Sequence, residues 1–167
     1  PGLAFDKSPN YVVNPIVPAV LRRFAPSLKL VVTLRNPSKR AYSHFQHDCR
    51  NGRILTLNGT VVRGRGPGRR LAYPCSPADF DNMVASQLGA ARAKYTGGEW
   101  TCRWALGDDA RGDSNALPRG FYACQLARWF KYYPRSQFLP LIFERFITSR
   151  AATLSAVHDI ERFVGVQ

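Results

Sequence analysis

The residues best suited to bind an anion lie where a predicted strand is followed by a predicted helix. Residues 29–34 form an apolar, β-branched run, which is typical of a strand buried on both faces of a parallel sheet. A helix is predicted from about residue 39 to 50, with Asn36 as its N-cap. Anions bind at the carboxyl ends of strands and at helix N-termini, so Arg35 could clamp a phosphate and Ser43 could donate a hydroxyl hydrogen bond to it. The same pattern also fits an ordinary capped helix with solvated charges.

A carboxylate beside an ammonium group, Asp6-Lys7, lies near the start of the chain. Residues 5–13 predict a short strand and turn, with Pro9-Asn10 as the breaker. Neighbouring opposite charges keep both groups ionised, so Asp6 and Lys7 could form an acid–base pair at a strand end. An isolated Asp-Lys pair is more often two solvated charges, and the sequence leaves both interpretations open.

Two histidines, His44 and His47, are three residues apart on the helix predicted after Asn36, and Cys49 follows closely. Paired helical histidines can bind zinc, but no third ligand is evident and the chain has no Cys-x-x-Cys pair. We expect no metal site. One of the histidines is expected to act on a substrate or to pack at the edge of a pocket.

The remaining chain alternates strands and helices, an order that predicts one α/β domain with a parallel central sheet flanked by helices. Gly- and Arg-rich residues 51–74 are expected to form a long, solvated excursion, and residues 96–119 an irregular stretch. The predicted helices lie at 19–24, from Ser76-Pro77 past Leu88, at 121–133 and from about 148 to Gly165, with a second apolar strand at 137–143. No apolar run is long enough to span a membrane, and no secretory leader is evident.

The chain is strongly basic, with 24 Lys and Arg residues, 11 Asp and Glu residues and a formal net charge of +13 over 167 residues. An apolar share of 45% excludes a wholly disordered chain. The surplus is concentrated between residues 35 and 70, where only Asp48 opposes it. It favours polyanionic partners, namely nucleic acid, anionic lipid, a sulfated or carboxylated glycan, or a nucleotide.

The cysteines and one sequon give weaker signals about the compartment. Two disulfides among Cys49, Cys75, Cys102 and Cys124 would suit an oxidising compartment, but four free thiols in a cytosolic protein fit almost as well. The tripeptide Asn58-Gly59-Thr60 is a glycosylation sequon and tilts weakly toward the secretory pathway.

Two blocks of sequence resemble the heparan sulfate sulfotransferases, Golgi enzymes that use 3'-phosphoadenylyl sulfate and include N-sulfotransferase and 3-O-sulfotransferase branches. The first block is Asp-Lys-Ser-Pro-Asn-Tyr at residues 6–11. The second spans residues 34–47 and carries the specific pattern Arg-Asn-Pro followed by Arg-Ala-Tyr-Ser. The resemblance covers most of the chain except residues 51–74 and 96–119. Supporting matches are Val17-Pro18, Gly120-Phe121-Tyr122, Arg128-Trp129 and residues 162–166.

The resemblance assigns roles to individual residues. It implies that Arg35 and Ser43 hold the 3'-phosphate of the sulfate donor. Asp6 stands where the family usually has a Glu acting as general base on the acceptor amine or hydroxyl, so its reach is shorter by one methylene. Lys7 would help to neutralise the sulfonate, and His47 would lie near the acceptor.

The resemblance also implies a P-loop-like sulfotransferase domain without its first strand, loop and helix. The family's 5'-phosphosulfate loop is expected upstream of Pro1 and a later donor-binding loop downstream of Gln167. We therefore expect residues 1–167 to be a partial domain, and the resemblance does not imply that it is active alone. The implied partners are the nucleotide sulfate donor and a polyanionic glycan acceptor, and the implied location is the Golgi lumen, with any membrane anchor outside this chain.

A non-enzymatic polyanion-binding module is the alternative. Arg63, Arg65, Arg69 and Arg70 could grip RNA or a glycan, with Tyr73 stacking on bases. The chain has no aromatic-rich strand motif of an RNA-recognition fold, so nucleic acid is not the expected partner. Preference for 3'-phosphoadenosine 5'-phosphate over AMP separates the two hypotheses.

Overall fold

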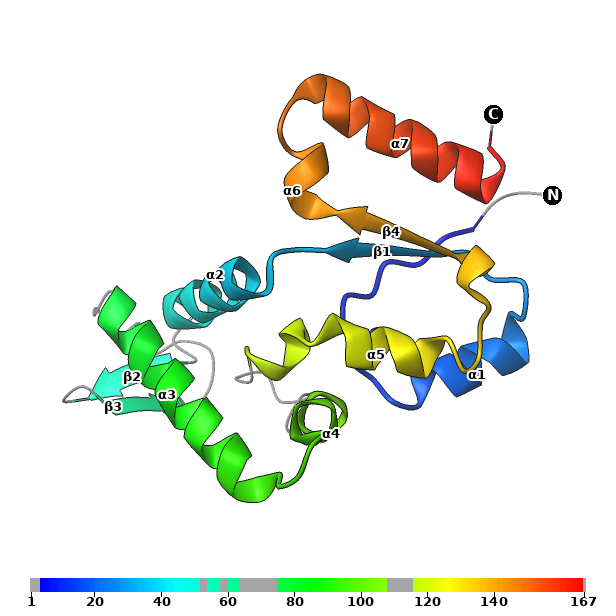
Figure 1. Cartoon of the computed structure of the whole chain (residues 1–167). Coiled ribbons are helices and arrows are strands. Elements are labelled where there is room, and N and C mark those ends of the chain that lie inside the picture. Colours follow the sequence, from blue (N-terminus) through cyan, green and yellow to red (C-terminus); the bar gives the residue numbers. More distant parts are fainter. Residues whose placement is uncertain (1–3, 52–53, 58–59, 64–74, 108–115, 167) are drawn as a thin grey trace.

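Two parallel strands, β1 (Leu30–Leu34) and β4 (Phe138–Ile142), form the sheet that organises the fold. The computed structural model describes residues 4–51, 54–57, 60–63, 75–107 and 116–166. The strands pair in register from Leu30 beside Phe138 to Leu34 beside Ile142. Their carboxyl ends therefore lie next to each other (Figure 1). The predicted α/β class with a parallel sheet is confirmed.

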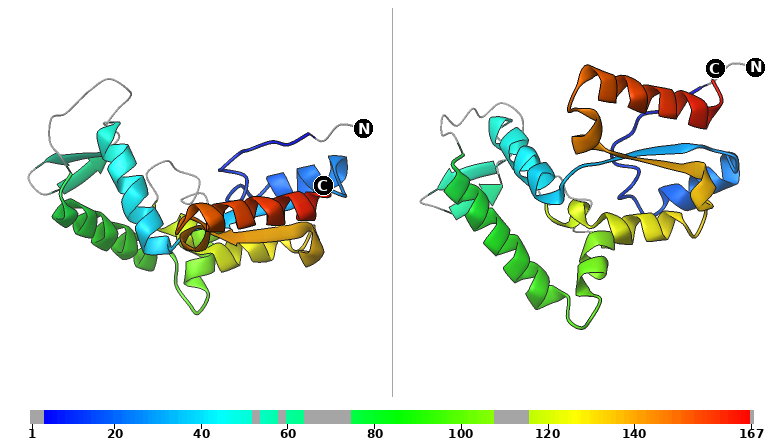
Figure 2. Two further views of the ribbon diagram at one scale, coloured as in Figure 1. Left: turned by 90° about the horizontal axis from the view of Figure 1, so that it is seen from above. Right: turned by 45° about the horizontal axis from the view of Figure 1, so that its top comes forward.

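Helices lie on both sides of this sheet. Figures 1 and 2 show α7 (Arg150–Val164) on one side, with α1 (Val17–Phe24) and α5 (Tyr122–Trp129) on the other. Trp129 and Phe130 meet the Phe138 ring edge-on, with ring centroids 6.3 and 4.9 Å apart. Lys29 Nζ donates to the Phe163 carbonyl at 2.5 Å, which places a cation at the negative end of α7. Aromatic packing and this helix-end contact thus fix the layers.

Capping residues begin and end the helices where the sequence predicts. Helix α2 (Pro37–Arg50) follows Asn36, whose Oδ1 accepts from the Lys39 N–H at 3.0 Å. Helix α3 (Pro77–Lys94) begins with a capping box, in which Ser76 Oγ accepts from the Asp79 N–H and Asp79 Oδ2 accepts from the Ser76 N–H. Helix α7 ends at Gly165, whose φ of 83° favours glycine.

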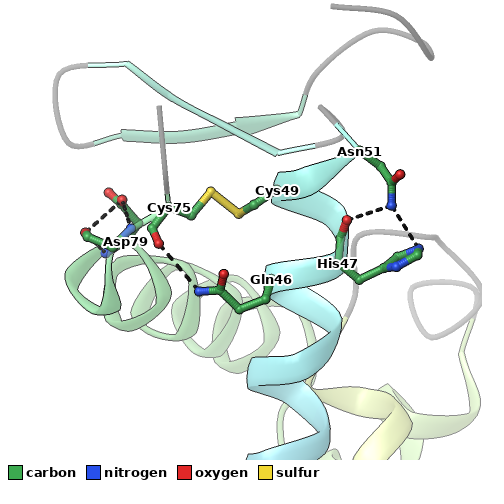
Figure 3. The surroundings of a disulfide bond; sticks show 7 residues. Gln46, His47, Cys49, Asn51, Cys75 and Asp79 are labelled. Atoms are coloured by element: carbon green, nitrogen blue, oxygen red, sulfur yellow. Dashed lines mark hydrogen bonds between the residues drawn. A yellow bond between two sulfur atoms is a disulfide. The ribbon is translucent and has the colours of Figure 1, made fainter. Parts of the chain in front are cut away.

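The inner face of α2 packs against α3 and a short segment before α5. Ala41 and Phe45 of α2 are buried together with Met83 of α3 and Ala116. A disulfide between Cys49 and Cys75 joins the end of α2 to the residues just before α3 (Figure 3). A second disulfide, Cys102–Cys124, joins α4 (Trp100–Leu106) to α5. The structure thus pairs Cys49 with Cys75 and Cys102 with Cys124, a pairing that the sequence left open.

Two stretches expected to be irregular contain regular elements. Within residues 51–74, β2 (Ile54–Leu57) and β3 (Thr60–Arg63) pair antiparallel, because their β-branched and apolar residues favour strands. Within residues 96–119, α4 forms because Trp104 and Ala105 are buried, and tertiary packing stabilises a helix too short to persist alone. The expectation of irregular structure was wrong for both elements.

Two further expectations differ from the structure. Residues 5–13 contain no strand, whereas the predicted turn at Pro9-Asn10 is present and the Tyr11 N–H donates to the Ser8 carbonyl at 3.2 Å. After the turn, Arg128 of α5 donates to the carbonyls of Val12 and Val13, and Trp129 donates to that of Val12. Strand β1 is not buried on both faces, and Val31 is 39% exposed. Within the described residues β1 has β4 as its only strand neighbour, so one edge and part of its surface remain open.

Of the helices that the structure describes, none combines the length and apolar character needed to cross a membrane. Asn58, Arg65, Arg69, Arg70 and Tyr73 lie outside the described residues, as does the side chain of Arg63. The remaining elements are the turns of 3-10 helix η2 (Pro118–Gly120) and η3 (Arg135–Gln137) and the helix α6 (Phe143–Phe146).

Candidate functional site

The candidate site lies where the carboxyl ends of β1 and β4 meet two helix starts (Figure 1). Strand β1 leads through Arg35 and Asn36 into α2, whereas β4 leads directly into α6. Because the last residues of the two strands pair with each other, Arg35 comes level with Phe143 and Asn36 with Glu144. Open α/β sheets bind their ligands at such carboxyl ends.

Arg35 is held from two sides and keeps an unused donor. Its guanidinium lies over the Phe143 ring, 5.2 Å from the centroid, within the range of a cation–π contact. The Tyr122 hydroxyl, at the start of α5, donates to the Arg35 carbonyl at 3.0 Å. The Arg35 Nε is buried and has no hydrogen-bond partner among the residues that the structure describes. The side chain is half-buried at the strand end, so its guanidinium places a positive charge there that can attract an anion.

A second arginine, Arg40, braces the start of α2 against the segment before α5. Its Nη2 donates to the Ala116 carbonyl, and burial lowers the pKa of its guanidinium. Gly120 permits the close approach, because a Cβ there would lie 3.1 Å from the Cβ of Pro37. Tyr122 bonds to the Arg40 side chain as well as to the strand end. These contacts fix the first turn of α2 relative to α5.

One carboxylate, Glu144, faces the cations of this junction. Its Oε1 accepts a hydrogen bond from the Asn36 N–H at 2.9 Å. That bond lowers the pKa of the Glu144 carboxyl, with smaller contributions from Lys39 and Arg35. The carboxylate is therefore ionised at neutral pH.

Ser43 and His47 share one exposed face of α2, since they are four residues apart on the helix. The Asn51 Nδ2 lies 3.1 Å from His47 Nε2 and donates to the His47 carbonyl at 2.8 Å (Figure 3). The neighbouring His44 pairs with Asp48 instead, at 3.3 Å.

Asp6 and Lys7 are exposed, in a segment without regular structure. The Ser8 hydroxyl lies 3.4 Å from both carboxylate oxygens of Asp6. Within the described part of the chain, neither residue forms a hydrogen bond or ion pair with the predicted residues on β1 and α2. The segment is tethered nearby, because Asn10 Oδ1 accepts from Arg119 at 3.2 Å. The four residues from Asn10 back to Asp6 can span at most about 13 Å.

The sequence marked residues 34–43 as a junction, and the roles predicted there for Arg35 and Ser43 stay predictions. Arg40 lies in that junction without an assigned role, and Glu144 and Tyr122 were not included. A signal for Glu144 was present, because it directly follows a strand predicted to end at Phe143, and the carboxyl ends of parallel strands adjoin. The contacts of Tyr122 and Arg40 depend on how α5 and the segment before it pack against α2. The described residues contain no group of three or more His, Cys, Asp or Glu side chains placed to hold a metal ion.

Comparison with curated proteins finds relatives along nearly the whole chain, although no protein-family model matches it. The human bifunctional heparan sulfate N-deacetylase/N-sulfotransferase 2 is 26% identical over 162 residues, which are 97% of this chain and 14% of that protein. The human heparan sulfate glucosamine 3-O-sulfotransferase 6 is 26% identical over 165 residues, 99% of this chain and 36% of that protein. The chain is homologous to heparan sulfate sulfotransferases. The resemblance predicted from the sequence is confirmed.

A solved structure shows the fold. The crystal structure of a sulfotransferase from Alicyclobacillus acidocaldarius superposes with a TM-score of 0.63 and 22% sequence identity, covering 96% of this chain and 49% of that one. The arrangement of β1, β4 and their helices is therefore a sulfotransferase fold. The chain spans about one seventh of the N-deacetylase/N-sulfotransferase relative and about half of this structural neighbour.

Proposed function

We propose that this chain forms part of a sulfotransferase domain that moves a sulfonate from 3'-phosphoadenylyl sulfate to an amine or hydroxyl of a heparan sulfate-like glycan. The observation that carries the proposal is homology over 97% of the chain to a protein named as a heparan sulfate sulfotransferase. The Arg35 guanidinium, which lies over the Phe143 ring at the carboxyl end of β1, supports it from the structure.

The donor's 3'-phosphate is assigned to Arg35 and Ser43. Arg35 offers a charge-assisted bond at the strand end, and the exposed Ser43 hydroxyl lies about 9 Å farther along the α2 axis from Pro37. Lys39, on the same face as Ser43, adds positive charge between them. These groups would bind and orient the donor, which is the main demand of sulfonate transfer.

Transfer breaks the bond from sulfur to the donor's phosphate oxygen, forms one to the acceptor and releases a proton from the acceptor. We assign Asp6 as the base for that proton, Lys7 as a cation that neutralises the sulfonate, and His47 to the acceptor side. The acceptor is a polyanionic glycan, to which the formal net charge of +13 is complementary. Two disulfides fit an oxidising compartment, and we place the protein in the Golgi lumen.

Calorimetry on the complete protein that contains this chain tests the proposal. We expect 3'-phosphoadenosine 5'-phosphate to bind at least tenfold more tightly than 5'-AMP. Arg35→Ala should weaken only the first, by about 1.5–3 kcal/mol, because it removes a hydrogen bond to a charged group. Arg23→Ala, an exposed arginine on α1, is the matched control and should change neither affinity.

The outcome also separates the enzyme from a polyanion-binding module. A module that binds polyanions by diffuse charge would show no loss specific to Arg35, so Arg35→Ala and Arg23→Ala would have equal small effects on the binding of 3'-phosphoadenosine 5'-phosphate. That result would reject the sulfotransferase proposal. Sulfonate transfer from 3'-phosphoadenylyl sulfate to N-desulfated heparan sulfate is the direct measurement of the activity.

A further inference from the structure

The pairing of β1 and β4 continues beyond the sheet as contacts between side chains and backbone. One step past the strands, the Arg35 guanidinium lies over the Phe143 ring. Two steps past them, the Asn36 N–H donates to Glu144 Oε1 at 2.9 Å. The register of the sheet thus extends into the residues that begin α2 and α6, and Glu144 makes the outermost contact.

Three hydrogen bonds hold Asn36, one each at its backbone N–H, its side-chain oxygen and its carbonyl. Its backbone N–H is held by Glu144, and its side-chain oxygen holds the Lys39 N–H at 3.0 Å. Its carbonyl accepts from the Arg40 N–H at 2.9 Å. Because Asn36 directly follows Arg35, fixing it also fixes the backbone from which the Arg35 side chain projects.

The same hydrogen bonds occupy most of the N–H groups that a helix start otherwise leaves without a partner. Pro37 has no N–H, and those of Asn36, Lys39 and Arg40 are bonded within the junction. Across the described residues, Ser38 is left as the first-turn residue whose N–H has no acceptor. The helix start therefore offers little to an anion by itself, and recognition depends on where the Arg35 guanidinium is held.

We propose that Glu144 is a positioning residue of the donor site, which holds Arg35 in place by accepting the Asn36 N–H. The proposal rests on the proposed function, since the anion that Arg35 receives is the donor's 3'-phosphate. Glu144 acts through its hydrogen bond and not through contact with the donor. An acceptor oxygen of the same length should therefore be sufficient in its place.

Two substitutions separate the hydrogen bond from the charge. Glu144→Gln keeps an acceptor oxygen at the same reach, so binding of 3'-phosphoadenosine 5'-phosphate should stay within about threefold of the unaltered protein. Glu144→Ala removes the acceptor and should weaken that binding about tenfold, because loss of a charge-assisted hydrogen bond releases the junction. Binding of 5'-AMP, which lacks the 3'-phosphate, should not change. Glu161→Ala, an exposed glutamate on α7, is the control and should leave both affinities unchanged.

The proposal is overturned if Glu144→Ala binds the 3'-phosphorylated nucleotide normally, if Glu144→Gln loses as much as Glu144→Ala, or if both nucleotides weaken equally. Absence of any preference for the 3'-phosphate in the unaltered protein would instead reject the proposed function. The contact itself is tested without nucleotide by amide NMR. The Asn36 amide shift should titrate in acid in the unaltered protein and not in Glu144→Gln, and an Asn36 amide insensitive to pH would overturn the positioning role on its own.

Discussion

The carboxyl of Glu144 gives the junction a stability that depends on pH. The Asn36 N–H and, more weakly, Lys39 and Arg35 hold its folded-state pKa below the ordinary value of 4.5. A depressed carboxyl pKa contributes stability above the unfolded-state pKa, and this contribution is lost as the pH falls through the folded-state pKa. The thermal midpoint of the unaltered protein should therefore exceed that of Glu144→Gln at neutral pH, and the difference should shrink in acid. A difference unchanged between about pH 7 and pH 3 would contradict the assignment.

The proposed role of Asp6 as general base rests on the resemblance, because within the described residues no contact joins Asp6 to Arg35. If it takes the acceptor proton, Asp6→Asn in the complete protein should lower turnover by roughly 10²–10⁴-fold and leave donor affinity intact. Asp6→Glu restores the residue usual in the family and should retain or raise turnover. Asp159→Asn, an exposed carboxylate on α7, is the control. Normal turnover of Asp6→Asn would leave Asp6 as a solvated partner of Ser8.

Side-chain caps mark the starts of α2, α3 and α7, and α3 shows their effect most simply. Ser76 and Asp79 bond to each other's backbone N–H groups, which satisfies donors that a helix start leaves open. Ser76→Ala should lower the free energy of unfolding by about 1 kcal/mol in urea denaturation. Ser86→Ala, an exposed position within the same helix, should lower it little or raise it slightly, because alanine favours the helix interior. Equal effects of the two changes would show that the cap does not stabilise α3.

Elements with strong local signals were predictable from the sequence, and elements made by packing were not. The sequence predicts three helix ends, at Asn36-Pro37, at Ser76-Pro77 and at Gly165. The structure has helix ends at all three places. The helix α4 was missed because glycines flank it and its seven residues depend on burial of Trp104. The hairpin of β2 and β3 is an exception to this division, because Asn58-Gly59 between two apolar runs is a local hairpin signal. It was missed because Gly and Arg dominate the composition of residues 51–74.

The same division holds for the candidate site. Arg35 and Ser43 were proposed from the sequence because a strand end and a helix start are local features, and their role in donor binding stays a prediction. The contact between Asn36 and Glu144 joins residues 108 positions apart, so it follows only from the register of β1 against β4. The strand predicted within residues 5–13 is absent, and the end of this segment is held instead by Arg128 and Trp129, which bond to the carbonyls of Val12 and Val13 and which no local pattern reveals.

At the scale of the whole molecule, α2 connects the proposed donor site to a disulfide. Its first residue, Pro37, lies next to Arg35 and Asn36, and Cys49 near its last turn is bonded to Cys75. Twelve residues separate these two positions along the chain, about 18 Å along the helix axis. The disulfide therefore lies too far from Arg35 to contact a nucleotide there. Stability and donor binding should respond separately when one end of α2 is changed.

Removal of this disulfide tests that separation. Cys49→Ala combined with Cys75→Ala should lower the free energy of unfolding by about 2–4 kcal/mol, because the unfolded chain gains the freedom of a segment closed across 26 residues. The affinity for 3'-phosphoadenosine 5'-phosphate, measured at a temperature where the variant is folded, should stay within about twofold, since the Phe45 core holds α2 in place. Cys102→Ala with Cys124→Ala is the informative comparison, because it loosens α4 from α5 and hence the helix that carries Tyr122. That variant should lose both stability and affinity. Equal losses of affinity in the two double variants would show that the ends of α2 are coupled and that the donor junction depends on the molecule as a whole.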